Sequence, residues 1–177
     1  ISATIGDIKD SKKIIKKIKL FDELNLDFIK FGFFIDNIDQ MSKFLHIIKS
    51  CNFKTELVPV VFVDIINILE IAFNNLEIFK SFKFNFLLLD TFFKGKGDLL
   101  KNCSFQYLSN FLRRANKLEL SVGLAGKVKQ SQVPDLLKLK PKIIGFRSAV
   151  CKKNIRNDAI SGKKLEKIHQ LFKLDTS

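Results

Sequence analysis

The stretch that decides the fold runs Phe86-Leu87-Leu88-Leu89-Asp90-Thr91-Phe92-Phe93-Lys94-Gly95-Lys96-Gly97. Its short apolar run is typical of a strand that is buried on both faces, as in a parallel sheet covered by helices. The run ends in the carboxylate Asp90, and Lys94 follows four residues later on a glycine-rich loop. Because the carboxyl ends of strands carry the chemistry in parallel α/β proteins, Asp90 and Lys94 are candidate site residues.

A second apolar run, residues 28–34, carries a lysine, Lys30, in its interior. Lysine is almost never fully buried unless it has a partner or a chemical role. Two lysines and one aspartate at such positions indicate carbonyl chemistry, in which an amine forms an imine or moves a proton. An imine forms only from the neutral amine, so we expect Lys30 and Lys94 to lie close enough to disfavour each other's charge.

The bulk composition favours one globular domain, because 46% of the 177 residues are hydrophobic. The longest apolar run, residues 58–73, contains Asp64 and Glu70 and therefore predicts no membrane span. No signal peptide is visible, and the three cysteines form no CxxC pair. We expect a cytoplasmic protein without disulfides, metal or cofactor. The chain starts in a predicted strand without a methionine, so we expect a trimmed or incomplete N-terminus.

The net charge of +13 comes mostly from lysines that are scattered along helical patterns. Solvated helix faces explain such a pattern without a polyanionic partner. The 19 phenylalanines lie within strands or at helical spacing, and no nucleic-acid-binding motif accompanies them. We therefore expect no nucleic-acid partner. A basic nucleic-acid-binding α/β protein stays open as an alternative, which a steep salt dependence of binding would reveal.

Strand and helix patterns alternate along the whole chain without a linker. The predicted strands cover residues 1–5, 28–33, 57–63, 85–89, 120–124 and 143–146. The predicted helices cover residues 11–24, 38–50, 65–79, 104–117, 131–139 and 161–172, with Ser104 as an N-cap. Six βα units predict either a doubly wound sheet or part of a (βα)8 barrel, which needs about 250 residues when complete.

Small residues follow the last two predicted strands, in Ala125-Gly126-Lys127 and in Gly145-Phe146-Arg147-Ser148. Free backbone N–H groups there suit a phosphate, because the loops after the final two barrel strands commonly bind one. The predicted phosphate-binding residues are Ala125, Gly126, Arg147 and Ser148. The dinucleotide-binding alternative requires a GxGxxG segment after the first strand, and the sequence has none.

Two further carboxylates follow predicted strands. Asp7 comes after the first strand and Asp64 after the third. Asp64 ends its strand as Asp90 does, but it could equally be the N-cap of the next helix. We keep Asp7 and Asp64 as additional site candidates.

Five ordered segments of the chain resemble one family. They are residues 2–7, 27–32, 89–94, 124–126 and 145–152, the last followed by Arg156-Asn157. In order and spacing they are similar to the signature segments of (5-formylfuran-3-yl)methyl phosphate synthase, also called 4-(hydroxymethyl)-2-furancarboxaldehyde-phosphate synthase. The resemblance covers almost the whole chain, and five ordered motifs are far more specific than any one of them.

The resemblance implies an α/β fold of the TIM (βα)8-barrel type. The chain would be a single incomplete domain, residues 1–177, that spans strands three to eight. In this family Lys30 would match the proton acceptor, and Asp90 and Lys94 would line the active site with it. The Schiff-base lysine belongs to a strand that precedes Ile1. The chain is therefore expected to be either a fragment or a copy without that chemistry.

The implied activity is that of a carbon–oxygen lyase acting on phosphates, early in methanofuran biosynthesis. It would join two glyceraldehyde 3-phosphate molecules into a phosphorylated furan aldehyde. We expect this small phosphorylated aldehyde as the substrate, no membrane partner, and a homo-oligomer. Another phosphosugar barrel enzyme, similar to class I aldolases, is the alternative that shares the lysine chemistry but makes a different product.

Overall fold

The structure, a computed structural model, describes residues 1–93, 95–155 and 157–174. Its centre is one sheet of parallel strands in the order β1-β2-β3-β4-β5-β6. The strands are β1 (Ser2–Thr4), β2 (Phe28–Gly32), β3 (Glu56–Phe62), β4 (Phe86–Asp90), β5 (Ser121–Leu124) and β6 (Ile143–Ile144). A doubly wound sheet reverses its strand order at a switch point, and this sheet does not. The barrel-type fold is therefore the one that the chain adopts.

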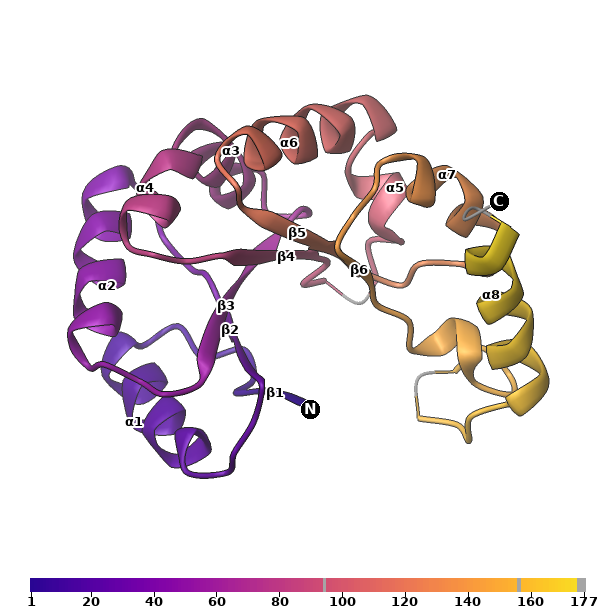
Figure 1. Cartoon of the computed structure of the whole chain (residues 1–177), viewed down its shortest axis with the longest axis horizontal. Helices are drawn as coiled ribbons and strands as arrows, with labels where there is room; N and C mark the ends of the chain where they lie inside the picture. Colours follow the sequence, from indigo (N-terminus) through magenta and orange to yellow (C-terminus); the bar gives the residue numbers. More distant parts are fainter. Residues whose placement is uncertain (94, 156, 175–177) are drawn as a thin grey trace.

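The sheet is curled into a half-barrel, with the helices along its convex side (Figure 1). Within the described ranges, β1 pairs only with β2 and β6 only with β5. The two outer strands thus lie at opposite ends of an open curve, and each keeps one unpaired edge.

Eight α-helices of the described chain follow the strands. They are α1 (Ser11–Asp22), α2 (Ile38–Ser50), α3 (Ile66–Asn74), α4 (Leu76–Ser81), α5 (Leu99–Asn102), α6 (Phe105–Lys117), α7 (Val133–Lys138) and α8 (Gly162–Leu174). Short 3₁₀ turns, η1 (Gln130–Gln132) and η2 (Ser148–Val150), precede α7 and α8. The predicted N-cap Ser104 is confirmed, because its hydroxyl accepts the N–H of Tyr107. None of the described helices combines the length and the apolar character that crossing a bilayer requires.

The helix predicted for residues 65–79 is wrong in one respect, since it is two helices that meet at Asn75. The Asn75 side-chain amide donates to the carbonyl of Ile71 at 2.8 Å. A side chain that bonds the preceding turn offers the backbone an alternative to continued helix, which explains the break. Helix α5 was not predicted at all, because it is a single turn. The last strand is also shorter than the predicted residues 143–146.

The two faces of the sheet differ in what they contact. On β2, Ile29 and Phe31 are fully buried against the helices, and the Phe31 ring packs edge-on against Phe44 of α2, with 5.9 Å between ring centroids. Side chains alternate along a strand, so Lys30 and Gly32 lie on the opposite, concave face. We call this concave side the inner face. It is the side on which barrel enzymes gather their site residues at the carboxyl ends of the strands.

Candidate active site

Lys30 lies on the inner face near the open edge of the sheet. Its register partners are Thr4 of β1 and Val58 of β3. Its neighbours Ile29 and Phe31 are buried on the helix side, whereas Lys30 itself is half-buried. The strand therefore directs this lysine away from the apolar core and towards the concave side of the sheet.

Asp90, the last residue of β4, shares the inner face with Lys30. Strand β3 relates them, because Lys30 is in register with Val58 and Asp90 with Phe62. Val58 and Phe62 are four positions apart, so they project to the same face at levels about 13 Å apart along the strand. One carboxylate oxygen of Asp90 accepts the N–H of Thr91 at 2.7 Å. The two predicted site residues thus share a face at different depths, and Asp90 lies nearer the carboxyl edge.

Asp64 is not the N-cap of the next helix, which corrects one of its two predicted roles. The N-cap residue of α3 is Ile65, and it makes no side-chain cap bond. The two carboxylate oxygens of Asp64 instead accept the N–H groups of Phe92 at 2.7 Å and Phe93 at 2.6 Å. Asp64 therefore ties the end of β3 to the loop after β4. The next residue of that loop, Lys94, lies outside the described residues.

A buried carboxylate that the sequence reasoning missed, Asp98, holds the far end of the same loop. It accepts the N–H of Lys101 at 3.1 Å as the N-cap of α5. It also accepts Gln132 Nε2 at 3.0 Å and pairs with Lys129 Nζ at 2.7 Å. Burial acts to raise the pKa of Asp98, but these hydrogen bonds outweigh it and hold the pKa below its ordinary value. An aspartate after Gly97 and before an apolar pair is an N-cap signal that could have found it.

Two of the backbone N–H groups that we predicted to be free for phosphate are already bonded within the sheet. The N–H of Ala125 donates to the carbonyl of Leu89 at 2.8 Å. The N–H of Gly145 donates to the carbonyl of Leu124, also at 2.8 Å. The prediction of free N–H groups was wrong at these positions. Pairing with β4 continues to Ala125, one residue past the predicted strand 120–124, and Gly145 pairs with β5 from within the predicted strand 143–146.

Gly126 lies where a side chain would not fit. Its φ of +105° is a conformation that glycine adopts readily. A Cβ there would lie 2.9 Å from Thr91 Cγ2 and 3.0 Å from the Thr91 backbone nitrogen. The Gly126 carbonyl also accepts the N–H of Leu99 at 2.8 Å. The loop after β5 therefore packs directly on the loop after β4, and the glycine makes this approach sterically feasible.

The remaining predicted residues follow the outer strands. Arg147 is exposed, and Ser148 is half-buried at the start of η2. The Arg147 carbonyl accepts the N–H of Val150 at 3.3 Å and the Cys151 thiol at 3.2 Å. Asp7 is exposed in the loop after β1, at the opposite end of the curved sheet. All of these residues come after strands of one parallel sheet, and they therefore lie along its carboxyl edge.

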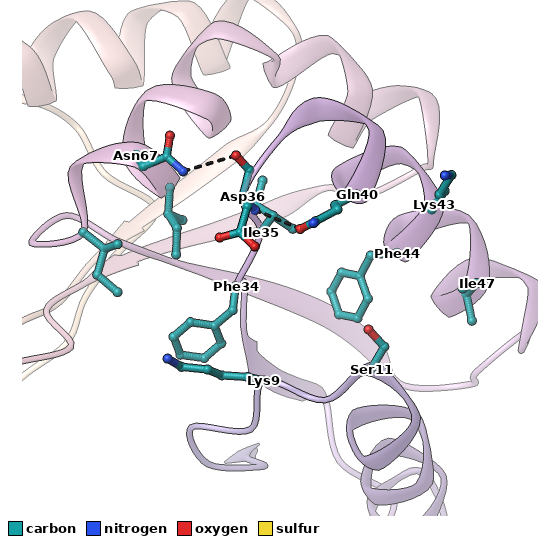
Figure 2. Close-up of a pocket in the computed structure, with 12 residues that line it drawn as sticks. Lys9, Ser11, Phe34, Ile35, Asp36, Gln40, Lys43, Phe44, Ile47 and Asn67 are labelled. Carbon is teal, nitrogen blue, oxygen red and sulfur yellow. Dashed lines mark hydrogen bonds between the residues drawn. The ribbon is translucent and has the colours of Figure 1, made fainter.

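A pocket of about 640 Å³ lies elsewhere, between the loop after β1 and helix α2 (Figure 2). None of the predicted site residues lines it. The backbone of Asp36 is fixed by Gln40 Oε1 at 3.0 Å and by Asn67 Nδ2 at 3.3 Å, and the Lys9 ammonium lies 5.5 Å from the Phe34 ring centroid. Its polar groups mainly hold the loop after β2. Carbonyl chemistry fits the inner face better, because that face carries both a half-buried lysine, Lys30, and a carboxylate at a strand end, Asp90.

The family described as 4-HFC-P synthase matches residues 1–169. The chain belongs to this family. The resemblance that the five ordered segments indicate is thereby confirmed.

Relatives of this 4-HFC-P synthase family member carry the name (5-formylfuran-3-yl)methyl phosphate synthase. The protein from Methanococcus aeolicus is 25% identical over 181 residues, an alignment that covers 98% of this chain and 76% of that protein. The protein from Methanococcus maripaludis is 32% identical over 80 residues, which cover 45% of this chain and only 34% of the relative. The relatives are named as synthases, so the family is one of enzymes.

Solved structures agree on the fold. Phosphoribosyl anthranilate isomerase from Thermus thermophilus superposes with a TM-score of 0.59 at 13% identity, covering 98% of this chain and 70% of that one. Thiamine phosphate pyrophosphorylase from Pyrococcus furiosus gives a TM-score of 0.55 at 12% identity, covering 100% of this chain and 84% of that one. Both are barrels of the TIM type, so the predicted fold class is confirmed. At these identities the likeness extends to the fold alone.

Proposed function

We propose that this chain forms part of an enzyme that converts two molecules of glyceraldehyde 3-phosphate into (5-formylfuran-3-yl)methyl phosphate, a precursor of methanofuran. The observation that carries the proposal is the shared inner face of Lys30 and Asp90, in a chain whose residues 1–169 match the 4-HFC-P synthase family. A half-buried amine and a carboxylate at a strand end are the groups that imine and proton-transfer chemistry requires.

The stoichiometry of this conversion defines the tasks of the site. Two triose phosphates contain one phosphate and the elements of two water molecules more than the furan aldehyde phosphate, so these must leave. Their departure needs proton transfers at carbon and at oxygen, together with a firm hold on the phosphate that stays. A site with these properties combines a base, an acid and a phosphate clamp.

The residues of this chain would divide those tasks as follows. Lys30 would accept a proton from carbon, and Asp90 would orient a lysine or move protons during dehydration. Gly126, Arg147 and Ser148 would hold phosphate at the other end of the carboxyl edge. Lys94 would complete the site from the loop after β4. The imine itself would form on a lysine of a strand that precedes Ile1, within the same barrel domain.

Borohydride trapping in the presence of glyceraldehyde 3-phosphate tests this proposal. We expect no adduct on the chain of 177 residues alone. The protein expressed from the whole reading frame, including any sequence upstream of Ile1, should give one adduct, release inorganic phosphate and form a furan aldehyde. The relative from Methanococcus aeolicus serves as the positive control. Neither adduct nor phosphate release from the whole reading frame would overturn the proposal, and trapping on Lys30 would overturn the division of roles.

A further inference from the structure

Asp64 links the loop after β3 to the loop after β4 through two hydrogen bonds. Its two oxygens accept consecutive backbone N–H groups, those of Phe92 at 2.7 Å and Phe93 at 2.6 Å. Hydrogen bonds to an ionised carboxylate are about twice as strong as those between neutral groups. Two such bonds on adjacent peptide units fix both the position and the direction of the chain at this point.

The segment that Asp64 holds is the segment that connects Asp90 to Lys94. The Phe92 ring, in turn, packs against Phe34 at 5.5 Å and Phe62 at 5.2 Å between centroids, both with edge-on geometry. The backbone contact and the ring packing act on the same residue from two directions. Contacts with Asp64, Phe62 and Phe34 therefore define the position of Phe92 and Phe93.

The far end of the loop is fixed independently. Asp98 is buried and bonded to Lys129 and Gln132 of the next loop, while Leu99 donates to the Gly126 carbonyl. Between the two anchors, Gly95 and Lys96 are exposed. Loss of the Asp98 anchor would separate the loop from the segment after β5. Loss of the Asp64 anchor would instead release the half of the loop that begins at Asp90.

We propose that Asp64 is a positioning residue, which acts through the backbone of Phe92 and Phe93 to hold the loop after β4 against the inner face. The role requires an acid, because a carboxylate offers two acceptor oxygens and an asparagine offers one. In Asp64→Asn the side chain keeps almost the same shape, but its NH₂ group would face one of the two backbone N–H groups. Two donors cannot bond each other, so one of the two hydrogen bonds is lost. The consequence for substrate rests on the proposed function, whereas the consequence for the loop does not.

Hydrogen–deuterium exchange of the full chain tests the loop directly. In Asp64→Asn we expect the amides of Phe92 and Phe93 to exchange about ten- to hundredfold faster, because a charged-group hydrogen bond that restrains them is lost. The peptides that cover β2 and α6 should exchange as in the wild type. The matched control is Asp36→Asn, which removes a carboxylate from the loop after β2 without removing a contact to residues 92 and 93. Unchanged exchange at 92 and 93, or equal acceleration over the whole chain, would overturn the proposal.

Substrate protection separates a positioning role from a merely structural one. If the proposed function holds, glyceraldehyde 3-phosphate slows exchange of the loop after β4 in the wild type, and Asp64→Asn weakens this protection while a thermal melt remains cooperative. Asp64→Glu, which retains two acceptor oxygens, should restore part of the protection. Failure of the protein expressed from the whole reading frame to bind glyceraldehyde 3-phosphate would count against the proposed function, and the exchange result would then decide the role of Asp64. Full protection in Asp64→Asn would refute the positioning role.

Discussion

The Lys129 ammonium lies 2.7 Å from the Asp98 carboxylate and joins the loop after β5 to the first turn of α5. The pair is asymmetric, because the Asp98 side chain is 8% exposed and that of Lys129 is 67% exposed. A buried carboxylate is costly unless it is fully bonded, and Asp98 meets this condition with three donors, the Lys101 N–H in α5 and the Lys129 and Gln132 side chains after β5. The two segments that flank the proposed phosphate site are thus held together by one acid.

We predict that Asp98→Asn lowers the free energy of unfolding at neutral pH by about 1–3 kcal/mol, because a buried charge-assisted contact becomes a neutral one. The pKa of Asp98 is below its ordinary value of 3.8 in the folded state. Its contribution is therefore present above about pH 4 and is lost as the pH falls through the folded pKa. Urea melts from neutral pH down to acid should show the gap between variant and wild type narrowing below about pH 4. A gap that stays constant with pH would contradict the role of the charge. The pKa of Asp22 is also lowered in the folded state, so the stability of both the wild type and Asp98→Asn should still fall in acid.

The close approach of the two loops gives a second prediction. Gly126→Ala should destabilise the chain by about 1–3 kcal/mol. The alanine backbone would be strained at a φ of +105°, and its Cβ would clash with the Thr91 backbone. The matched control is Gly95→Ala, since a Cβ at Gly95 meets no atom within 4 Å. Thermal melts of the two variants distinguish position-specific crowding from a general effect of replacing glycine. Equal melting temperatures would mean that the loops separate at little cost.

Much of the fold could be predicted from the sequence, because buried parallel strands leave a continuous apolar signal. The predicted bounds of helix α2 match the structure without error, and those of strand β4 differ by one residue at each end. The short elements were predicted less well. The last strand was predicted as residues 143–146 but has two residues, and the four-residue helix α5 was missed, because so short a helix shows no repeating apolar pattern. The break at Asn75 depends on a side-chain bond to Ile71, which no periodicity reveals.

The candidate site was predicted less completely, because its contacts are long-range. Lys30 and Asp90 carried a local signal, each being a charged residue in or at the end of an apolar strand. The long-range partners of Asp64 and Asp98 carried none, since Phe92, Phe93 and Gln132 lie 28, 29 and 34 positions away in the sequence. A carboxylate before a helix is equally compatible with an N-cap and with a contact to another loop. The three-dimensional structure decides between these two roles, because it shows that the loops after the neighbouring strands β3 and β4 lie side by side.

The open edges of the sheet lead to a prediction about association. In the described part of the chain, the outer edges of β1 and β6 expose unpaired backbone groups beside apolar side chains such as Ile143. Such edges favour pairing with another chain, which the net charge of +13 opposes at low salt. We expect the chain to dimerise or aggregate, and to do so more strongly as added salt screens the charge. Light scattering after size exclusion at low and high salt measures this. A monomer that melts cooperatively at high salt would contradict the open-edge interpretation.

The separation of Lys30 from the phosphate-binding residues gives the last prediction. Lys30 lies on β2, whereas Gly126 and Arg147 follow β5 and β6, three and four strands away in the sheet. In the protein expressed from the whole reading frame, Lys30→Ala should lower kcat by at least about a hundredfold, the usual contribution of a catalytic base, and leave KM nearly unchanged. Arg147→Ala should raise KM by about tenfold or more and change kcat little, because a phosphate clamp stabilises the bound substrate and the transition state alike. Lys127→Ala, on the exposed loop next to Gly126, is the comparison for a general loss of positive charge. Steady-state kinetics of phosphate release gives both constants for each variant. Near-normal kcat in Lys30→Ala would assign Lys30 a structural role.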